Sequence, residues 1–490
     1  MFTLLMSFTY RNKALQLAPF FLISLGFILR ARQYLFQRNF WLDEAGFILN
    51  LQEKNYLELL SPLGWDKICP FGFLWVQKFM GDLFGYSELS MRFIPFIVGI
   101  SILPTSYNFI KMQLGTKQAL IVLLFGTLST YLIYYSNEAR KYELEVFLTI
   151  LIYIFWKKQN KVIGFILISV VSTLFTHSSI FILASLLLFE LLQLLKTEVK
   201  IKIIIIKHSS WIISFLLVYT LTLYNHPLTE VMKEYHSKNN AFIPHSNFTE
   251  SIIWLWINVK RLFVEPLGLS LTGGALIFFT IGLISQFHSK KTEVLIWLLP
   301  ILFSLITAAL ELYPFGNRFS LFLFLPLAFL LSEGIVSSFN SNKIYIGVTV
   351  LILSFNPILE NTKQFLKPEN KENIKPLIKS INSVFTKGDK IILSRHTESQ
   401  FRINNRCLLD KVFEEQDLIL SPQINSKDNF NNLIKSIQFK KRIFVLINHD
   451  YPIEKEFSTQ DKIIILKNQF ELEDIKTSSP NTFLITLQHK

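Results

Sequence analysis

Long apolar runs separated by short polar segments fill the first three quarters of the chain. Such runs reach roughly 17 to 20 residues, which is long enough for an α-helix to cross a bilayer core of about 30 Å. The pattern therefore predicts a polytopic α-helical membrane protein with about 11 transmembrane helices. The predicted spans lie at about 15–29, 93–110, 119–134, 144–156, 180–195, 211–224, 271–287, 294–310, 319–335 and 344–355, with one more that ends near 177.

The pattern changes near Glu360, where Lys, Asn, Glu and Asp alternate with short apolar runs. The runs "KIILSR", "RIFVLINH", "KIIILKNQ" and "TFLITLQ" predict buried strands between polar, helical stretches. We therefore expect a transmembrane domain at 1–358 and a soluble α/β domain at 359–490. The α/β part contains neither GxGxxG nor GxxxxGK[ST], so nothing in it indicates nucleotide binding.

Charge sets the expected orientation. The chain has a formal net charge of +13 and 51% hydrophobic residues. Much of the basic charge lies in short loops that the topology places on one side, which argues against nucleic acid as a partner and follows the positive-inside rule. We predict a multi-pass protein of the cytoplasmic (inner) membrane, with a cytoplasmic N-terminus and an extracytoplasmic α/β domain. The inner loops carry Lys111, Lys117, Lys157, Lys158, Lys161, Lys196, Lys200, Lys202, Lys207, Lys290, Lys291 and Lys343.

Some residues run against this pattern or leave it open. Arg30, Arg32 and Arg38 lie on the outer flank of the first span, where the positive-inside rule expects few cations. Bulky, basic residues follow that span, so we interpret it as an uncleaved helix rather than a removed signal peptide. Cys69 and Cys407 are too few for a metal cluster, and they permit a disulfide without indicating one.

Two amphipathic segments are predicted in the long outer loops. "FGFLWVQKFM" lies in the loop after the first span, and the Trp-rich "SIIWLWINVKRLF" lies in the loop after the seventh. We expect the first, which is amphipathic, to lie on the membrane surface or to re-enter the membrane, and the second to lie in the membrane interface.

Ionisable and aromatic residues from loops far apart in the sequence fall on this same outer face. Each has an ordinary explanation when taken alone, because arginines snorkel to headgroups and acidic loops form surface ion pairs. Their joint placement instead suggests a site for transfer from a lipid phosphate. A carboxylate can accept a proton from an attacking hydroxyl, and arginine can hold a leaving phosphate. The set comprises Asp43, Glu44, Arg92, Glu138, Arg140, Tyr142, His177, Tyr313 and Arg318.

Several stretches of the first 340 residues resemble bacterial membrane glycosyltransferases of the GT-C class. The resemblance is to glycosyltransferase family 39, with protein O-mannosyltransferases and lipid A aminoarabinose transferases as relatives. The acidic pair after the first span is its most specific element, and "CPFGFLW" matches a block that usually has two prolines, of which only Pro70 is present. The matching stretches are "WLDEAGFILN", "CPFGFLWVQKFMGDLFGYSELSMRFIPFIVGI", "YYSNEARKYELEVFL", "THSSIFILAS" and "YPFGNRFSLFLFLPL".

The resemblance implies transfer of one sugar from a polyprenyl-phosphate donor to a lipid, glycan or protein acceptor, with inversion at the anomeric carbon. It makes Asp43 the general base and Glu44 its supporting neighbour. Glu138 and Arg140 would complete the catalytic pocket, with Tyr142 orienting it. Arg318 would contact the donor phosphate. We expect His177, Arg92 and Tyr313 to support the substrate-binding part of the site.

Some relatives in this class use a divalent metal and others do not, so the resemblance implies no certain cofactor and names no metal ligands. Two other functions remain open at this point. A transporter or flippase of lipid-linked sugars would need broken helices, midplane charges and internal repeats, and no clear repeat is present. A non-catalytic membrane scaffold would leave the acidic and arginine-bearing loops without a role.

Overall fold

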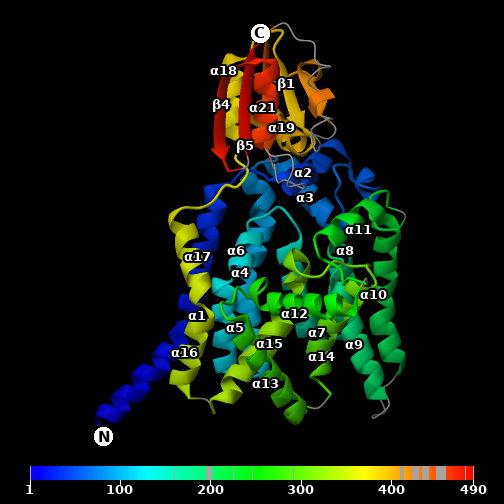
Figure 1. The fold of residues 1–490 in the computed structure, drawn as a ribbon. Helices are drawn as coiled ribbons and strands as arrows, with labels where there is room; N and C mark the ends of the chain where they lie inside the picture. Colours follow the sequence, from blue (N-terminus) through cyan, green and yellow to red (C-terminus); the bar gives the residue numbers. More distant parts are fainter. Residues whose placement is uncertain are drawn as a thin grey trace.

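The structure is a computed structural model in which a helical bundle carries a small α/β unit at one end (Figure 1). It describes residues 2–158, 161–194, 201–224, 226–245, 247–290, 292–340, 342–408, 413–421, 430–432, 441–448, 459–480 and 482–488. We call residues 372–488 the sheet unit, and we call the end of the bundle that faces it the domain end.

Each predicted apolar run lies in a helical part of the chain. The helices of the bundle are α1 (Phe2–Phe36), α4 (Glu88–Gln113), α5 (Thr116–Leu128), α6 (Thr130–Tyr135), α7 (Tyr142–Lys157), α8 (Val162–Phe175), α9 (Ser179–Leu194), α10 (Ile201–Thr222), α13 (Thr272–Lys290), α14 (Leu295–Ala309), η2 (Asn317–Leu323), α15 (Phe324–Ser338), α16 (Lys343–Leu353) and α17 (Phe355–Leu366). However, α1 begins 13 residues before its predicted span, α10 begins 10 residues before its span, and the span predicted at 119–134 covers two helices. Many of their apolar side chains are exposed, as expected of surfaces that face lipid.

The predicted number of eleven spans is not confirmed. Within the described residues, three helical segments are long and apolar enough to cross a membrane, namely α4, α10 and the continuous stretch Asn317–Ser338. A fourth is obtained if α16 and α17, which are bent by 53° at their junction, count as one span. Local breaks explain part of this difference. The hydroxyl of Ser129 accepts from the Leu132 amide and so begins α6, which divides one predicted run into two helices.

The pair α13 and α15 packs through two glycines. An added Cβ on Gly282 would lie 1.8 Å from the carbonyl oxygen of Leu330, and one on Gly334 would lie 1.7 Å from that of Phe278. Only glycine allows the two backbones to approach this closely, which is the usual way in which small residues bring membrane helices together.

The sheet unit is the predicted α/β structure. Its strands are β1 (Lys390–Ser394), β2 (Leu418–Ser421), β3 (Arg442–Asn448), β4 (Glu471–Ser479) and β5 (Thr482–Gln488), and its helices include α18 (Lys375–Val384), α19 (Arg395–Leu408) and α21 (Thr459–Gln469). The strand order is β2-β1-β3-β5-β4. β1 is parallel to β2 and β3, and β5 is antiparallel to β3 and β4. α18 and α19 pack against one face of the sheet, and α21 packs against the other.

One predicted strand is wrong. The run "KIIILKNQ" lies in helix α21, where Leu466 is fully buried and Ile464 is more than half exposed. A short continuous apolar run does not by itself distinguish a strand from a buried helix segment. The sequence pattern also missed β2 and the polar edge strand β4. The boundary predicted between residues 358 and 359 falls inside α17, and the division into two domains stays a prediction.

Three short elements follow α1 in the sequence, namely α2 (Leu42–Glu53), η1 (Glu58–Leu60) and α3 (Phe71–Phe84). Two of them, α2 and α3, lie between the bundle and the sheet unit in Figure 1. The second amphipathic segment forms α12 (Phe248–Val264), which follows α11 (Thr229–Lys238) and lies across the bundle in Figure 1. Its exposed face includes Ile253 and Trp256, and its buried face includes Trp254 and Leu262.

Candidate functional site

Helix α2 carries the acidic pair. Asp43 and Glu44 occupy its first turn, where the positive end of the helix dipole stabilises negative charge. Neighbouring residues of an α-helix point about 100° apart. The two carboxylates therefore have different partners, although they are adjacent in the sequence.

The Asp43 carboxylate is held by two cations. Its Oδ1 lies 2.9 Å from Nζ of Lys67, in the loop before α3, and its Oδ2 lies 2.6 Å from Nη1 of Arg318, in η2. Burial by itself would raise the pKa of Asp43. The attraction of Arg318, Lys67 and Arg140 outweighs that effect and holds the pKa well below its usual range. Asp43 is therefore ionised at every pH near neutrality.

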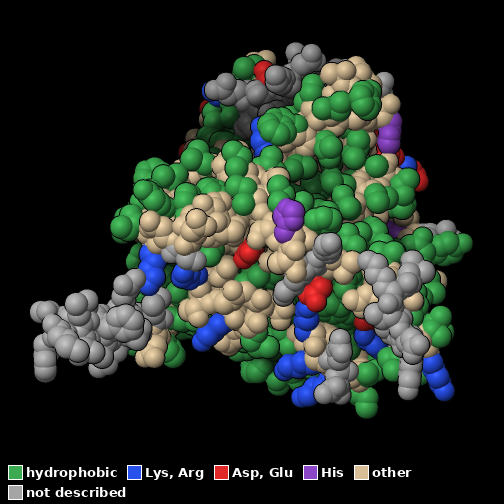
Figure 2. Space-filling view, turned by 90° about the horizontal axis from the view of Figure 1, so that it is seen from below, with side chains coloured by type: hydrophobic (Ala, Val, Ile, Leu, Met, Phe, Trp, Pro, Cys, Tyr) green, Lys and Arg blue, Asp and Glu red, His purple; other side chains and the backbone are tan. Residues whose placement is uncertain are grey.

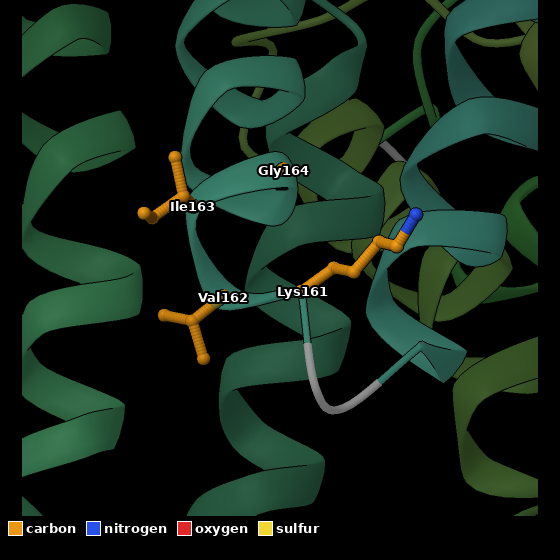
Figure 3. A pocket seen from close by; sticks show the side chains of 4 residues that line it. All are labelled: Lys161, Val162, Ile163 and Gly164. Carbon is orange, nitrogen blue, oxygen red and sulfur yellow. The ribbon is translucent and has the colours of Figure 1, made fainter.

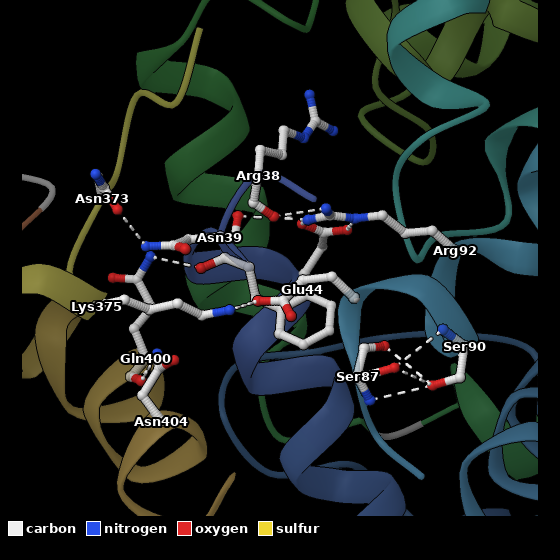
Figure 4. Close-up of polar contacts among 12 residues, drawn as sticks. Arg38, Asn39, Glu44, Ser87, Ser90, Arg92, Asn373, Lys375, Gln400 and Asn404 are labelled. Carbon is white, nitrogen blue, oxygen red and sulfur yellow. Dashed lines mark hydrogen bonds and ion pairs between the residues drawn. The ribbon is translucent and has the colours of Figure 1, made fainter. Parts of the chain in front are cut away.

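Glu44 forms a buried, two-point pair with Arg92 from α4. Its oxygens lie 2.8 Å from Nε and 2.5 Å from Nη2 of Arg92 (Figure 4). Oε1 of Glu44 also accepts from the backbone amide of Ala139 at 2.7 Å. Arg92 in turn donates to the carbonyl oxygens of Arg38 and Asn39. This pair ties α2, α4 and the loop before α7 together, and it does not contact the Asp43 carboxylate.

Glu138 is a buried carboxylate in the loop between α6 and α7. Neither of its oxygens has a hydrogen-bond partner among the described residues, and it is fully buried. The nearest cation is Arg38, whose Nη2 lies 3.9 Å from Oε2. Burial, followed by the like charge of Glu44, raises the pKa of Glu138 from 4.5 to about 7. This group therefore changes charge near neutral pH.

Tyr142 joins the two arginines of the site. The Arg318 guanidinium lies over the Tyr142 ring, 5.6 Å from its centroid, and the Arg140 guanidinium lies 5.9 Å from the same centroid. Trp41 and Phe319 also border Arg318, at 5.8 and 5.5 Å. Nη1 of Arg140 has no hydrogen-bond partner among the residues that the structure describes. The site thus combines three cations, one paired carboxylate and an aromatic wall.

Like the pair of Glu44 and Arg92, two other predicted residues make no ion pair or hydrogen bond to Asp43 among the described residues. His177 is placed 3.4 Å from the Thr222 hydroxyl, and burial, followed by the charge of Lys141, lowers its pKa well below the usual value. Tyr313 donates to the carbonyl oxygen of Phe319 at 3.4 Å and packs against that ring. Tyr313 therefore supports the wall beside Arg318, whereas His177 contacts neither Asp43 nor Arg318 in any hydrogen bond or ion pair among the described residues.

Lys67, Arg38, Trp41 and His236 border the site but were not predicted as part of it. The usable signal for Arg38 was its charge, because it is a cation on a flank where the positive-inside rule expects few. His236 on α11 lies 5.1 Å from the Phe319 centroid, and burial, followed by the charge of Arg318, lowers its pKa to about 4. Trp41 opens the matching stretch "WLDEAGFILN", whereas no pattern in the sequence pointed to His236.

A separate hollow lies at the beginning of α8, lined by Lys161, Val162, Ile163 and Gly164 (Figure 3), with a volume of about 430 Å³. It holds one charged side chain and no carboxylate. It lies at the start of a helix that ends beside His177, on the side of the bundle away from the sheet unit, and so is not part of the site around Asp43.

The two cysteines contribute no described cross-link. Cys69 is a buried free thiol two residues after Lys67, and the side chain of Cys407 lies outside the described residues. Burial raises the pKa of Cys69 to about 11, so it is a neutral thiol near neutral pH.

Three-dimensional comparison relates the chain to solved membrane transferases. ArnT from Cupriavidus metallidurans, bound to undecaprenyl phosphate, matches with a TM-score of 0.56 and 10% identity, over 97% of this chain and 98% of that one. Its apo form matches with a TM-score of 0.52 over 92% of this chain and 94% of that one, also at 10% identity. The oligosaccharyltransferase of Archaeoglobus fulgidus, in complex with Zn and sulfate, matches with a TM-score of 0.52 and 10% identity, over 95% of this chain and 72% of that one.

No protein-family model matches the chain, and no curated protein matches it in sequence. The structural matches nevertheless extend over nearly the whole chain, including both the helical bundle and the sheet unit. At 10% identity they establish the architecture and leave the chemistry to be argued from the site. The chain has the GT-C fold that ArnT and the archaeal oligosaccharyltransferase share.

Proposed function

We propose that the chain is an inverting glycosyltransferase that moves a sugar from a polyprenyl-phosphate donor to an acceptor hydroxyl at the domain end of the bundle. One observation carries the proposal: Arg318 and Lys67 each hold one oxygen of Asp43. A guanidinium and an ammonium that share a small anion in this way are suited to hold a phosphate. The fold and the ArnT complex with undecaprenyl phosphate support the same choice of donor.

Donor binding would also activate the base. With its two cations in place, Asp43 is too weak a base to accept a proton efficiently, because a general base works best with a pKa near the working pH. A donor phosphate that draws Arg318 and Lys67 toward itself would remove the charges that lower the pKa of Asp43. The pKa would then rise only when the donor is bound.

The transfer step balances in atoms and charge. The acceptor oxygen forms a bond to the anomeric carbon, and its proton passes to the Asp43 carboxylate. The bond between the anomeric carbon and the phosphate oxygen breaks, and the polyprenyl phosphate leaves with the electron pair. Arg318 and Lys67 would stabilise the charge that develops on that phosphate. Attack from the face opposite the leaving group gives inversion.

Glu138 and Arg140 would complete the pocket. Because the pKa of Glu138 is about 7, its carboxyl is largely protonated below that pH and can donate a hydrogen bond. We assign it the donation of a hydrogen bond to the donor. Arg140, held over Tyr142, adds a further positive charge beside the leaving phosphate. Glu44 and Arg92 would act as the frame that fixes α2 rather than as reacting groups.

The residues around Asp43 do not fit a divalent metal. Both of its oxygens already contact cations, and the pocket carries more positive than negative charge. Both Glu44 oxygens are engaged by Arg92. Among the described residues, no three His, Cys, Asp or Glu side chains are grouped so that they could hold one ion. The proposed mechanism therefore has no step through a metal.

The proposed location is the cytoplasmic membrane, with the N-terminus in the cytoplasm and the site on the outer face. In support of this orientation, Lys and Arg side chains appear at several places on the end of the bundle away from the sheet unit, where Asp and Glu are few (Figure 2). The positive-inside rule associates such a face with the cytoplasm. The acceptor is proposed only as a hydroxyl of a lipid, glycan or protein, and the Archaeoglobus fulgidus oligosaccharyltransferase tethered to an acceptor peptide supports keeping protein among these choices.

Binding of undecaprenyl phosphate to the purified protein tests the anion site directly. We expect Arg318→Ala to weaken binding at least tenfold, since each charge-assisted contact to phosphate contributes roughly 1.5–3 kcal/mol. Lys157→Ala is the matched control, because Lys157 pairs with Glu293 at the end of α7 opposite to Tyr142. Equal binding by wild type and Arg318→Ala would contradict the proposal.

A further inference from the structure

The first turn of α2 is capped from the sheet unit. Trp41 stands at the N-cap position of α2 and supplies no side-chain hydrogen bond. The backbone amide of Leu42 instead donates to Oε2 of Glu372 at 3.0 Å. Glu372 is only 4% exposed and lies far away in the sequence, just before α18. A carboxylate at this position satisfies an amide that the helix itself leaves free, and it also complements the helix dipole.

Glu372 is held in turn by Gln400 of α19. Nε2 of Gln400 donates to Oε2 of Glu372 at 2.6 Å and lies 3.1 Å from the carbonyl oxygen of Phe40. Oε1 of Gln400 accepts from the side-chain amide of Asn448, at the end of β3. Asn448 then accepts from the hydroxyl of Thr482 at 2.6 Å. A buried chain of hydrogen bonds therefore runs from two strands of the sheet to the first residues of the α2 region.

This contact occupies the carboxyl ends of the parallel strands β1 and β3. In open α/β sheets, that edge is where ligands usually bind. Here α19 packs against α2, and Ile403 of α19 lies in the same apolar cluster as Phe40 and Phe47. The edge of the sheet is thus used to hold part of the bundle.

Two further contacts flank this chain of hydrogen bonds (Figure 4). The side-chain amide of Asn39 lies 2.8 Å from Oδ1 of Asn373, and Lys375 pairs with Glu88 at the beginning of α4. In Figure 4, Gln400 and Lys375 lie on the side of the sheet unit and Glu44 and Arg92 on the side of the bundle, with Asn39 between them. The sheet unit is therefore joined to α4 as well as to the residues just before α2.

We propose that Glu372 and Gln400, supported by Asn448, are positioning residues through which the sheet unit sets the place of Asp43 relative to Arg318 and Lys67. Asp43 directly follows the residue that Glu372 caps. A shift of about 1 Å in a reacting group is enough to lower a rate by about 10²-fold. The catalytic part of this inference rests on the proposed glycosyl transfer, whereas the holding of α2 is a property of the fold and can be tested without it.

The test uses three variants of the full-length protein, each with a single substitution. Glu372→Met keeps the side-chain length and removes the acceptor, whereas Glu372→Gln keeps a carbonyl oxygen that can accept from Leu42 and Gln400. Arg402→Met is the matched control, because Arg402 lies on the same helix as Gln400 but pairs with Glu398 and Glu415. Two quantities are measured for each protein: amide hydrogen exchange of peptides covering residues 40–53, and kcat and KM for the donor.

We expect Glu372→Met to speed exchange in residues 40–53 at least fivefold and to lower kcat at least tenfold, with the donor KM changed less than threefold. Glu372→Gln should recover most of the slow exchange in residues 40–53 and most of kcat, and Arg402→Met should match the wild type in both measurements. Unchanged exchange in Glu372→Met would overturn the holding of α2. Faster exchange with an unchanged kcat would overturn the positioning of Asp43. A wild-type protein without transfer activity would refute the proposed function, and the exchange result would still decide the structural part.

Discussion

Glu138 should make the stability of this protein fall as the pH rises through neutrality. An unfolded glutamate ionises near 4.5, whereas burial raises the pKa of Glu138 in the folded protein to about 7. Between these values the unfolded state has lost the proton and the folded state keeps it. The contribution of Glu138 to the free energy of unfolding therefore decreases from about pH 4.5 to about pH 7 and is flat on either side. A shift of this size corresponds to roughly 3 kcal/mol, because each pKa unit is worth about 1.36 kcal/mol.

Glu138→Gln removes the ionisation while keeping the size and polarity of a protonated carboxyl. We expect it to unfold at the same temperature as the wild type at pH 5 and a few degrees higher at pH 8, as measured by thermal unfolding in mild detergent. Glu234→Gln is the control, because Glu234 is an exposed member of a surface pair on α11. If the difference in unfolding temperature between Glu138→Gln and the wild type is the same at pH 5 and pH 8, a buried, titrating Glu138 is refuted.

The same variant bears on the proposed chemistry, because glutamine resembles the protonated acid. If the protonated carboxyl donates to the substrate, Glu138→Gln should keep its transfer activity within about tenfold of the wild type, which is the scale of one hydrogen bond. Its activity should also lose the decline above pH 7 that the ionisation of Glu138 would cause. Complete loss of activity at pH 6 would instead show that the ionised form is needed.

Further predictions concern the frame of the site and the bundle. Glu44→Gln should lower the free energy of unfolding by about 3–5 kcal/mol, because it leaves Arg92 buried without its anion; a loss below about 1 kcal/mol in detergent unfolding would contradict a structural pair. Gly282→Ala should destabilise the protein by about 1–3 kcal/mol or more, since the new methyl meets a backbone carbonyl, whereas Gly273→Ala, with open space around it, should not; equal melting temperatures for the two would refute the close packing of α13 and α15.

The helices of the bundle were predictable because an apolar run is long and its composition is unmistakable. The sheet unit was predicted less well, since "KIIILKNQ" is short and its apolar character fits either a strand or a helix that is buried on one side. The edge strand β4 escaped because only one of its nine residues, Ser479, is buried. The number of spans was not recoverable either, because breaks such as the one at Ser129 depend on capping by single polar side chains.

The candidate site was predictable as a set of residues and not as a set of contacts. The sequence placed Asp43, Arg318 and Glu138 on one face, but it gave no way of seeing that Glu44 turns away to Arg92. Lys67 was missed because a single lysine in a long loop carries no pattern. The outward-lying arginines that opposed the charge rule are used inside the fold: Arg30 donates to the carbonyl of Gly126 at 3.0 Å, and Arg38 lies beside Glu138.

The central claim is that Asp43 accepts the proton in transfer from a polyprenyl-phosphate sugar. The most direct measurement is consumption of a panel of radiolabelled polyprenyl-phosphate sugars by purified wild type and Asp43→Asn, in membrane extract that supplies acceptors. Asp82→Asn is the control, because Asp82 is exposed on α3 and pairs with Lys78. We predict that wild type and Asp82→Asn consume one donor, and that Asp43→Asn inserts and binds undecaprenyl phosphate but consumes none. Consumption by Asp43→Asn at the wild-type rate would contradict the role of Asp43. Movement of intact labelled donor across liposomes without its consumption would replace the transferase with a transporter.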